Sequence, residues 1–166
     1  MAGEFSVEDY KKAVGSFVTG ITVVTAASDE GPVGFTCQSF TSLSLDPPTI
    51  LISLARTSRT FSTIAMRRKF CVNILGTGSA QIAHDFAFMD PGIRFTTHSW
   101  MSCESGNPVL HAALVWLDCE LVQSIEVEDH LIAIGRVVAV GQSGENHEPL
   151  TYFRGDFGGF IQLRDA

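Results

Sequence analysis

The chain has 166 residues, of which 45% are hydrophobic and 17% are charged, and its formal net charge is -7. These values predict one folded domain over residues 1–166 and exclude a disordered or coiled-coil chain. Because phosphate backbones bind to basic faces, an acidic chain with scattered Lys and Arg argues against nucleic acid as a partner.

The first predicted element is a helix that begins after the capping residue Ser6, with acidic residues in its first turn. Hydrophobic side chains recur at helical spacing at Tyr10, Ala13, Val14 and Phe17. This pattern favours a helix that covers one end of a sheet and ends at Gly20. Residues 21–27 (ITVVTAA) are rich in β-branched side chains and precede a polar turn, so we expect a hairpin with the next strand.

The most distinctive stretch runs from Gly34 to Pro48, GFTCQSFTSLSLDPP. Its alternation slips at Ser39-Phe40, which indicates a bulge or a sharp twist in one strand. The strand presents short, uncharged hydrogen-bonding side chains at Thr36, Gln38, Ser39, Thr41, Ser42 and Ser44. Such a surface suits a flat heterocycle with polar edges better than a metal ion or an acid–base pair.

Residues 49–55 (TILISLA) are nearly all apolar and predict a strand that is covered on both faces. The chain then runs through Arg56-Thr57-Ser58-Arg59-Thr60 into a helix whose inner face is marked by Phe61, Ile64 and Ala65. Hydroxyl groups at a helix N-terminus flanked by two arginines suit a phosphate, because free N–H groups and guanidinium both favour an anion. A capped helix with two solvated arginines is the alternative interpretation.

Residues 70–75 (FCVNIL) predict another strand, followed by Gly76-Thr77-Gly78-Ser79 and a helix with Ile82, Phe86 and Ala87 turned inward. A Gly-x-Gly between a strand and a helix is shared with the dinucleotide-binding fingerprint. The third glycine position holds Gln81, however, and no parallel βαβ unit follows. A helix capped by Ser79 explains the same residues.

The second half begins with an irregular segment from Asp90 to His111, whose length is typical of a lid or an interface. Residues 115–127 and 130–141 predict two strands joined by Glu128-Asp129, and the tail PLTYFRGDFGGF predicts a last strand or an ordered cap. Six or more hairpin-linked strands with three short helices favour a mainly β fold, an antiparallel β-barrel with peripheral helices, over a doubly wound sheet.

The cysteines and histidines show no spacing typical of a metal site. The four cysteines, Cys37, Cys71, Cys103 and Cys119, are far apart and predict reduced, mostly buried thiols of a cytoplasmic protein.

There is no GxSxG elbow and no carboxylate pair on a predicted pocket strand. No apolar run reaches membrane-spanning length, so no membrane association is expected. The high apolar content of a small acidic chain predicts a dimer.

One histidine differs from the other four, which we interpret as surface or loop residues. His130 opens a predicted strand directly after an acidic turn, where its ring could face a cleft and contact a substrate. A surface histidine paired with Asp129 or Glu128 is the alternative on these residues alone.

Taken in order, these motifs resemble the short-chain flavin reductase family, the reductase components of two-component flavin-dependent monooxygenases. The resemblance runs from Tyr10 to about Phe157 and includes GSFVTGITVVT, FTCQSFTSLSLDPPTILISL, RTSRTF, FCVNIL, the Arg94-Phe95 pair, DHLIAIGRV and PLTYFRGDF. It implies a split β-barrel of the flavin reductase-like, FMN-binding type.

The resemblance also implies which residues form the site. Those at the isoalloxazine edge are Thr36, Cys37, Gln38, Ser39 and Phe40, with Ser42 and Ser44 nearby. The segment that holds the ribityl phosphate is Ala55, Arg56, Thr57, Ser58, Arg59 and Thr60. His130 matches the histidine of a Gly-Asp-His motif beside the nicotinamide, and Arg94, Phe95, Phe153 and Arg154 complete the cofactor-binding set. The chain departs from the family at Glu128, where glycine is usual, and at Gln38, where asparagine or serine is common.

The implied activity is transfer of a hydride from NADH or NADPH to FAD or FMN, with reduced flavin passing to a partner monooxygenase. Two alternatives stay open: a flavin-binding carrier or sensor without turnover, and an oxidase similar to the pyridoxamine phosphate oxidases. The Asp129-His130 strand start favours the reductase. The sequence does not choose between the two flavins or between the two nicotinamide donors.

Overall fold

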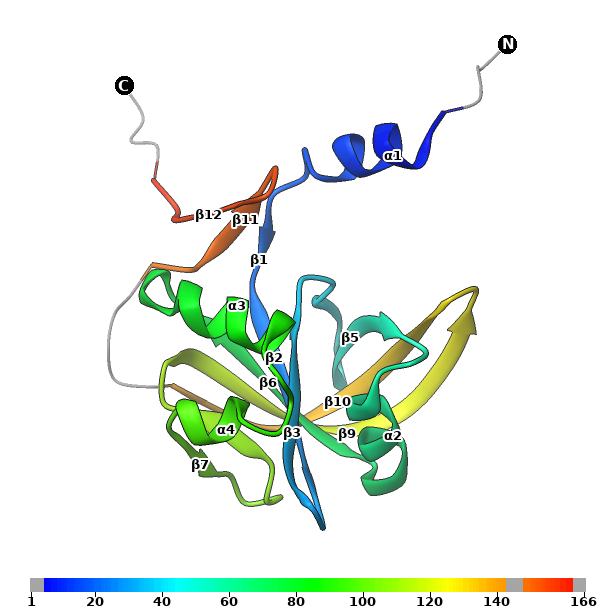
Figure 1. Ribbon diagram of the computed structural model, residues 1–166. Coiled ribbons are helices and arrows are strands. Elements are labelled where there is room, and N and C mark those ends of the chain that lie inside the picture. Colours follow the sequence, from blue (N-terminus) through cyan, green and yellow to red (C-terminus); the bar gives the residue numbers. More distant parts are fainter. Residues whose placement is uncertain (1–4, 143–147, 163–166) are drawn as a thin grey trace.

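The structure, a computed structural model, describes residues 5–142 and 148–162 and is built around one antiparallel sheet. Seven strands lie in the order β3-β2-β6-β9-β10-β5-β4 (Figure 1). They are β2 (Thr22–Ser28), β3 (Gly31–Cys37), β4 (Thr41–Leu45), β5 (Pro48–Ala55), β6 (Lys69–Leu75), β9 (Ala113–Val127) and β10 (His130–Gln142). The sheet curls until β3 approaches β5 without pairing with it, which makes the predicted split barrel.

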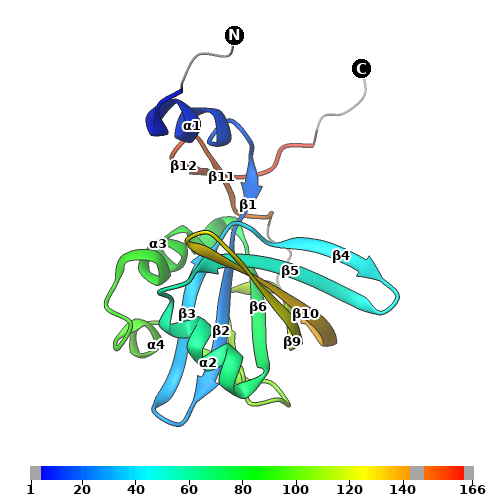
Figure 2. The same cartoon turned by 90° about the vertical axis from the view of Figure 1, so that its right-hand side faces the viewer.

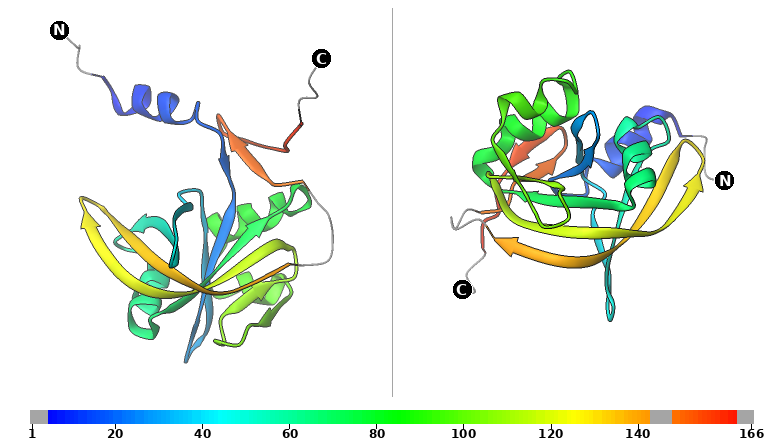
Figure 3. Two further views of the ribbon diagram at one scale, coloured as in Figure 1. Left: turned by 180° about the vertical axis from the view of Figure 1, so that it is seen from behind. Right: turned by 90° about the horizontal axis from the view of Figure 1, so that it is seen from below.

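Smaller elements surround the barrel. A three-stranded sheet contains β1 (Thr19–Gly20), β11 (Thr151–Phe153) and β12 (Asp156–Gly158), and a hairpin joins β7 (Trp100–Ser102) to β8 (Pro108–Leu110). The helices are α1 (Val7–Val14), α2 (Arg59–Arg67), the 3-10 turn η1 (Thr77–Ser79), α3 (Ala80–Phe88) and α4 (Arg94–Thr97). Figures 2 and 3 show α1 and the small sheet standing away from the barrel, whereas α2 and α3 lie against it. Within the described ranges, no helix is long and apolar enough to cross a membrane.

Two hydrophobic clusters form the core. One lies inside the barrel beneath α2 and includes Ile52, Ile64 and Phe70, and the other lies beneath α3 and includes Leu75 and Phe86. All five of these side chains are fully buried. Burial of this kind supplies most of the free energy that holds the helices on the sheet.

The polar stretch from Gly34 to Pro48 forms two strands, so the prediction of one bulged strand was wrong. β3 ends at Cys37, β4 begins at Thr41, and the two strands lie at opposite edges of the sheet. Residues 38–40, which we call the crossing segment, pass from one edge to the other. The Ser39 hydroxyl fastens it to β5, because Oγ donates to the Ser53 carbonyl and accepts from the Ser53 N–H, each at 2.8 Å.

We expect Ser39→Ala to lower the free energy of unfolding by about 1–3 kcal/mol, because the Ser53 N–H and carbonyl lose these partners. Ser42→Ala is the matched control, since Ser42 is exposed on β4, and should change the same quantity by less than about 0.5 kcal/mol. Urea unfolding of the two variants measures the difference. Equal midpoints for both would show that the crossing segment does not depend on the Ser39 hydroxyl.

The first helix is shorter than predicted and does not cover the sheet. α1 ends at Val14, Gly15 is its C-cap, and no residue within it is buried. The predicted cap is confirmed: Ser6 Oγ accepts from the Asp9 N–H at 3.1 Å, and the Asp9 carboxylate accepts from the Ser6 N–H at 3.0 Å. Helical spacing of apolar residues indicates a helix, but it does not say what covers the apolar face.

Three further expectations about burial are corrected. β5 alternates between buried and more exposed residues, so it is not covered on both faces. In α2 and α3 the inward positions Ile64 and Phe86 are confirmed, but Ala65 and Ala87 are exposed. Ser79 precedes α3 without capping it, because its Oγ donates to the Ala112 carbonyl at 3.3 Å.

The segment from Asp90 to His111, predicted to be irregular, contains α4 and the β7-β8 hairpin and is held to α3 by a buried carboxylate. His98 Nε2 lies 2.9 Å from Asp85 Oδ2, and Gln81 donates to Asp85 Oδ1 at 2.7 Å. With a side chain only 13% exposed, His98 is a structural partner rather than a surface histidine. Burial alone would raise the pKa of Asp85, but hydrogen bonds from Gln81, His98 and His84 hold it below its ordinary value.

A lowered pKa at Asp85 has a definite consequence for acid stability. The carboxylate stabilises the fold above its ordinary pKa of 3.8, and this contribution is lost as pH falls through the lower folded pKa. We therefore expect Asp85→Asn to lower the Tm at neutral pH and to flatten the fall of Tm between about pH 4 and pH 2. Thermal unfolding followed by circular dichroism at stepped pH, with exposed Glu30→Gln as the control, tests this. Parallel curves for wild type and Asp85→Asn would contradict it.

Candidate functional site

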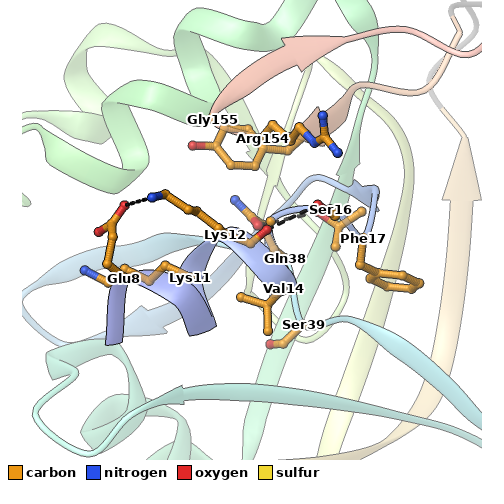
Figure 4. A pocket seen from close by; sticks show the side chains of 13 residues that line it. Glu8, Lys11, Lys12, Val14, Ser16, Phe17, Gln38, Ser39, Arg154 and Gly155 are labelled. Atoms are coloured by element: carbon orange, nitrogen blue, oxygen red, sulfur yellow. Dashed lines mark hydrogen bonds and ion pairs between the residues drawn. The ribbon is translucent and has the colours of Figure 1, made fainter. Parts of the chain in front are cut away.

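A cavity of about 920 Å³ opens between α1, the crossing segment and the β11-β12 hairpin (Figure 4). The crossing segment contributes Gln38 and Ser39 to its lining. The opposite walls contain Lys11, Lys12, Val14 and Phe17 from α1 and the turn after it, and Tyr152, Arg154 and Gly155 from the hairpin. The cavity therefore joins parts of the chain that are more than a hundred residues apart.

A tight turn in the hairpin ties these walls together. Arg154 has φ 51 and Gly155 has φ 99, so both lie in the left-handed region that reverses the chain between β11 and β12. The Arg154 N–H donates to the Gly15 carbonyl at 3.0 Å, which fastens the end of α1 to the hairpin. The Arg154 guanidinium lies over the exposed Phe153 ring, 5.0 Å from its centre.

Only part of the predicted polar strand reaches the cavity. Gln38 is exposed there, and its Oε1 accepts a long 3.5 Å hydrogen bond from the Thr19 hydroxyl. Thr36 instead donates to the Ala83 carbonyl of α3, and Ser44 donates to the Asp46 carbonyl in the β4-β5 turn. Ser42 is exposed on β4, and Phe40 packs against the barrel core. The hydroxyls of Thr36, Ser39 and Ser44 thus bond to the chain's own backbone.

Three of the four cysteines are buried and all four are free, as the sequence predicted. Burial raises the pKa of the Cys37 thiol, although hydrogen bonds from Ser39, Thr22 and Phe40 oppose the rise. Burial also raises the pKa of Cys71 and of Cys119. Because a thiolate is the reactive form of cysteine, these raised pKa values disfavour all three as nucleophiles.

The segment from Ala55 to Thr60 lies beside the β9-β10 turn and outside the cavity under α1. The Arg56 N–H donates to the Asp129 carbonyl at 3.0 Å, and its guanidinium contacts the Glu128 carbonyl and the Glu126 carboxylate. Ser58 caps α2, accepting from the Phe61 N–H at 3.4 Å, whereas Thr57 is exposed and Thr60 is buried. Arg59 lines a separate groove, of about 580 Å³, beside the β2-β3 turn. The two arginines of the predicted anion site therefore do not converge on one cavity.

His130 opens β10 and pairs across the sheet with Ala55 at the end of β5. Its Nδ1 is 2.7 Å from Asp129 Oδ1, and its side chain is 50% exposed. This hydrogen bond, followed by the charge of the imidazole, lowers the pKa of Asp129. Glu128 has φ 50, so the residue at this position adopts the left-handed conformation that glycine adopts without strain.

Arg94 and Phe95 hold the segment before β7 to the barrel. The buried Arg94 guanidinium donates to the Gly34 carbonyl at 2.7 Å, and through Nε and Nη2 to the Met89 carbonyl. Phe95 meets Phe86 and Trp100 edge to face, with ring centres 5.1 and 5.9 Å apart. Neither residue lines the cavity under α1.

Residues 14–160 match the family described as Flavin reductase like domain. The chain belongs to this family. The reductase subunit HsaB of a flavin-dependent monooxygenase from Mycobacterium tuberculosis is 32% identical over 160 residues, which cover 96% of this chain and 85% of that protein. An NADH:FMN oxidoreductase from Rhodococcus qingshengii is 35% identical over 153 residues, covering 90% of this chain and 79% of the relative.

A solved structure confirms the same fold. The Streptomyces globisporus NADH:FAD oxidoreductase SgcE6, in complex with NAD and FAD fragments, superposes with a TM-score of 0.88 and 30% identity. The alignment covers 99% of this chain and all of that one. The split barrel of the flavin reductases is therefore the fold of this chain, as its sequence motifs implied.

The side chains at the cavity fit the cofactors of this flavin reductase family. Gln38 offers an exposed carboxamide to a polar ring edge, and Lys11, Lys12 and Arg154 offer positive charge to a phosphate. The volume suits a ligand of nucleotide size. Sequence reasoning missed the two lysines, because α1 was taken for a helix packed on the sheet. Their signal is a pair of adjacent lysines in an otherwise acidic chain.

Proposed function

We propose that this protein is an NAD(P)H:flavin oxidoreductase, which reduces FAD or FMN and supplies the reduced flavin to a partner monooxygenase. The observation that carries the proposal is the family match over residues 14–160. The two relatives described above whose names give a donor are both named for NADH, which favours NADH over NADPH here.

The proposed flavin site follows β5 from the crossing segment to the α2 cap. Ser39 bonds to Ser53, and Ala55 lies two residues further along the same strand, about 7 Å away. Ala55 in turn pairs with His130. Ser39 and His130 are therefore both neighbours of β5, at Ser53 and at Ala55, although no single cavity contains all the proposed site residues.

When both cofactors are bound, the nicotinamide supplies a hydride and the flavin accepts it. The residues of the chain bind and orient the two rings. In this proposal Gln38 and the backbone of the crossing segment face the ring edge, Arg56 and Ser58 approach the ribityl phosphate, and His130 borders the nicotinamide. Correct alignment of two bound reactants is itself a large part of the rate enhancement, so few acid–base groups are required.

An anaerobic stopped-flow series tests the function. Purified protein is mixed with FAD or FMN and with NADH or NADPH, and loss of the oxidised flavin absorbance is followed. Rapid bleaching in at least one of the four combinations supports the reductase. Flavin binding without bleaching would support a carrier or sensor, and consumption of an amine without NADH would support an oxidase.

We also infer that the protein is a cytoplasmic homodimer that acts as one domain over residues 1–166. An eight-residue helix without a buried side chain is not stable in isolation, and α1 exposes Val7 and Tyr10, which do not line the cavity. A second copy that covers this face would stabilise it. Light scattering after gel filtration should give twice the chain mass of 18.0 kDa, and a monomer at micromolar concentration would contradict the inference. Four free thiols fit a reducing compartment.

A further inference from the structure

Three cationic residues line the cavity under α1, although the chain as a whole has a net charge of -7. Lys11 and Lys12 lie on α1 and Arg154 lies on the hairpin, and Figure 4 shows them around the same space. Glu8 is the one carboxylate among the described residues that line the cavity. Its Oε1 is 3.9 Å from Lys12 Nζ and both side chains are largely exposed, so this ion pair is weak. With Glu8 counted, these four lining residues carry a formal charge of +2. The cavity is therefore positive on a negative protein.

Packing in a hydrophobic core does not explain why these three cationic residues lie at the cavity. α1 buries none of its residues, so the lysines are not held in place by a core. Arg154 is stacked on Phe153, which restricts the guanidinium before any ligand arrives. The bond from the Arg154 N–H to the Gly15 carbonyl keeps the hairpin beside the end of α1. The cations thus stand on two connected walls of one cavity.

The other residues that line the cavity restrict the kind of ligand that it can bind. Gln38 and Ser39 line the same cavity, so a ligand that meets the cations also approaches the crossing segment. Such a ligand must carry negative charge at one end, to meet the cations. At the other end it must carry uncharged hydrogen-bonding groups, to meet Gln38 and Ser39. A phosphate joined to a nucleoside has both features, and charge-assisted hydrogen bonds from Lys and Arg are the usual way in which proteins hold it.

Two molecules in the proposed reaction carry such a phosphate, the flavin and the nicotinamide dinucleotide. The flavin phosphate is assigned above to the segment from Ala55 to Thr60, which lies outside this cavity. We propose that Lys11, Lys12 and Arg154 bind the pyrophosphate of the nicotinamide dinucleotide, so that α1 is a wall of the substrate site. This inference rests on the proposed reductase function and adds the place of the second nucleotide.

Direct binding tests it without turnover. ADP-ribose has the pyrophosphate and the adenosine half of the dinucleotide but no nicotinamide, and its affinity is measured by calorimetry beside that of FMN and of riboflavin. We expect Lys11→Gln/Lys12→Gln to weaken ADP-ribose binding by about tenfold, and Arg154→Gln to weaken it by about fivefold. FMN and riboflavin should bind as they do to wild type. Lys69→Gln is the control, because Lys69 is exposed on β6, away from this cavity; it loses one charge, as Arg154→Gln does, whereas the double variant loses two.

Steady-state kinetics give a second readout. The KM for NADH should rise in Lys11→Gln/Lys12→Gln while kcat stays within about twofold, and added salt should weaken wild-type binding more than binding by the variant. Arg154→Lys should retain most of the affinity that Arg154→Gln loses.

Three results would overturn the inference: no ADP-ribose binding by wild type, equal binding by Lys11→Gln/Lys12→Gln and Lys69→Gln, or weakened FMN binding with ADP-ribose unaffected. The last would place the flavin phosphate under α1. Failure of the reductase function is a separate outcome, seen as wild-type protein that oxidises neither NADH nor NADPH with either flavin.

Discussion

Gly135→Ala should lower the free energy of unfolding by about 2–3 kcal/mol, because β10 passes directly over a buried ring at this point. A Cβ added at Gly135 would lie 2.5 Å from Cζ and 2.9 Å from Cε1 of Phe70, and 3.2 Å from Cβ of Cys119. Phe70 is fully buried inside the barrel, so its ring has no space into which it can turn. Either the ring or strand β10 must shift, and both are paired or packed on every side.

Chemical denaturation measures this effect. Gly78→Ala is the matched control, since a Cβ there would meet nothing within 4 Å, and it should leave the midpoint nearly unchanged. In a Gly135→Ala background, Phe70→Leu should cost less than it does in the wild-type protein, because the smaller side chain relieves the contact. If Gly135→Ala unfolds at the same denaturant concentration as Gly78→Ala, the barrel is looser than these distances indicate.

The second large effect concerns the proposed reaction. We expect His130→Ala to reduce kcat/KM for NADH by about 10- to 100-fold while flavin affinity changes by less than about twofold. His130 pairs with Ala55 at the end of β5, and the Asp129 carboxylate fixes its ring through the 2.7 Å contact to Nδ1. Loss of the ring therefore removes a group that orients a substrate, but it does not disturb the crossing segment.

Two variants separate orientation from structure in this experiment. Asp129→Asn removes the charge that fixes the ring and should give a smaller loss than His130→Ala, together with an altered pH profile of kcat/KM. His84→Ala removes an exposed histidine on α3, whose side chain is 57% exposed, and should leave turnover unchanged. Equal losses of turnover and flavin affinity in His130→Ala would assign His130 a structural role.

Local signals in the sequence predicted the elements whose partners lie nearby in the chain. The cap at Ser6 and the β2-β3 turn each depend on residues within a few positions, and both form as expected. The long β9-β10 hairpin was predicted from its β-branched runs and its acidic turn, because the two strands pair with one another. Such features require no knowledge of distant parts of the fold.

Features that depend on distant partners were missed or placed wrongly. Periodicity located the interruption at Ser39 but could not show that β3 and β4 lie at opposite edges, because alternation encodes a buried face and not a neighbour. Ala65 and Ala87 were taken as inward because alanine is apolar, yet its small side chain gains little from burial at either position. The contact between Arg154 and Gly15 joins residues 139 positions apart and has no local signature. The resemblance named Gln38, Ser39 and Arg154, but the cavity that joins them to α1 has no local signal in the sequence.

The crossing segment has one more implication, for how the protein holds and releases a small molecule. Ser39 bonds the crossing segment to β5 and its neighbour Gln38 lines the cavity, so two adjacent residues both close the barrel and form part of the binding site. A ligand that binds these residues stabilises the state in which Ser39 is bonded to β5, by mass action. Conversely, local opening of the crossing segment releases the ligand before the rest of the sheet unfolds.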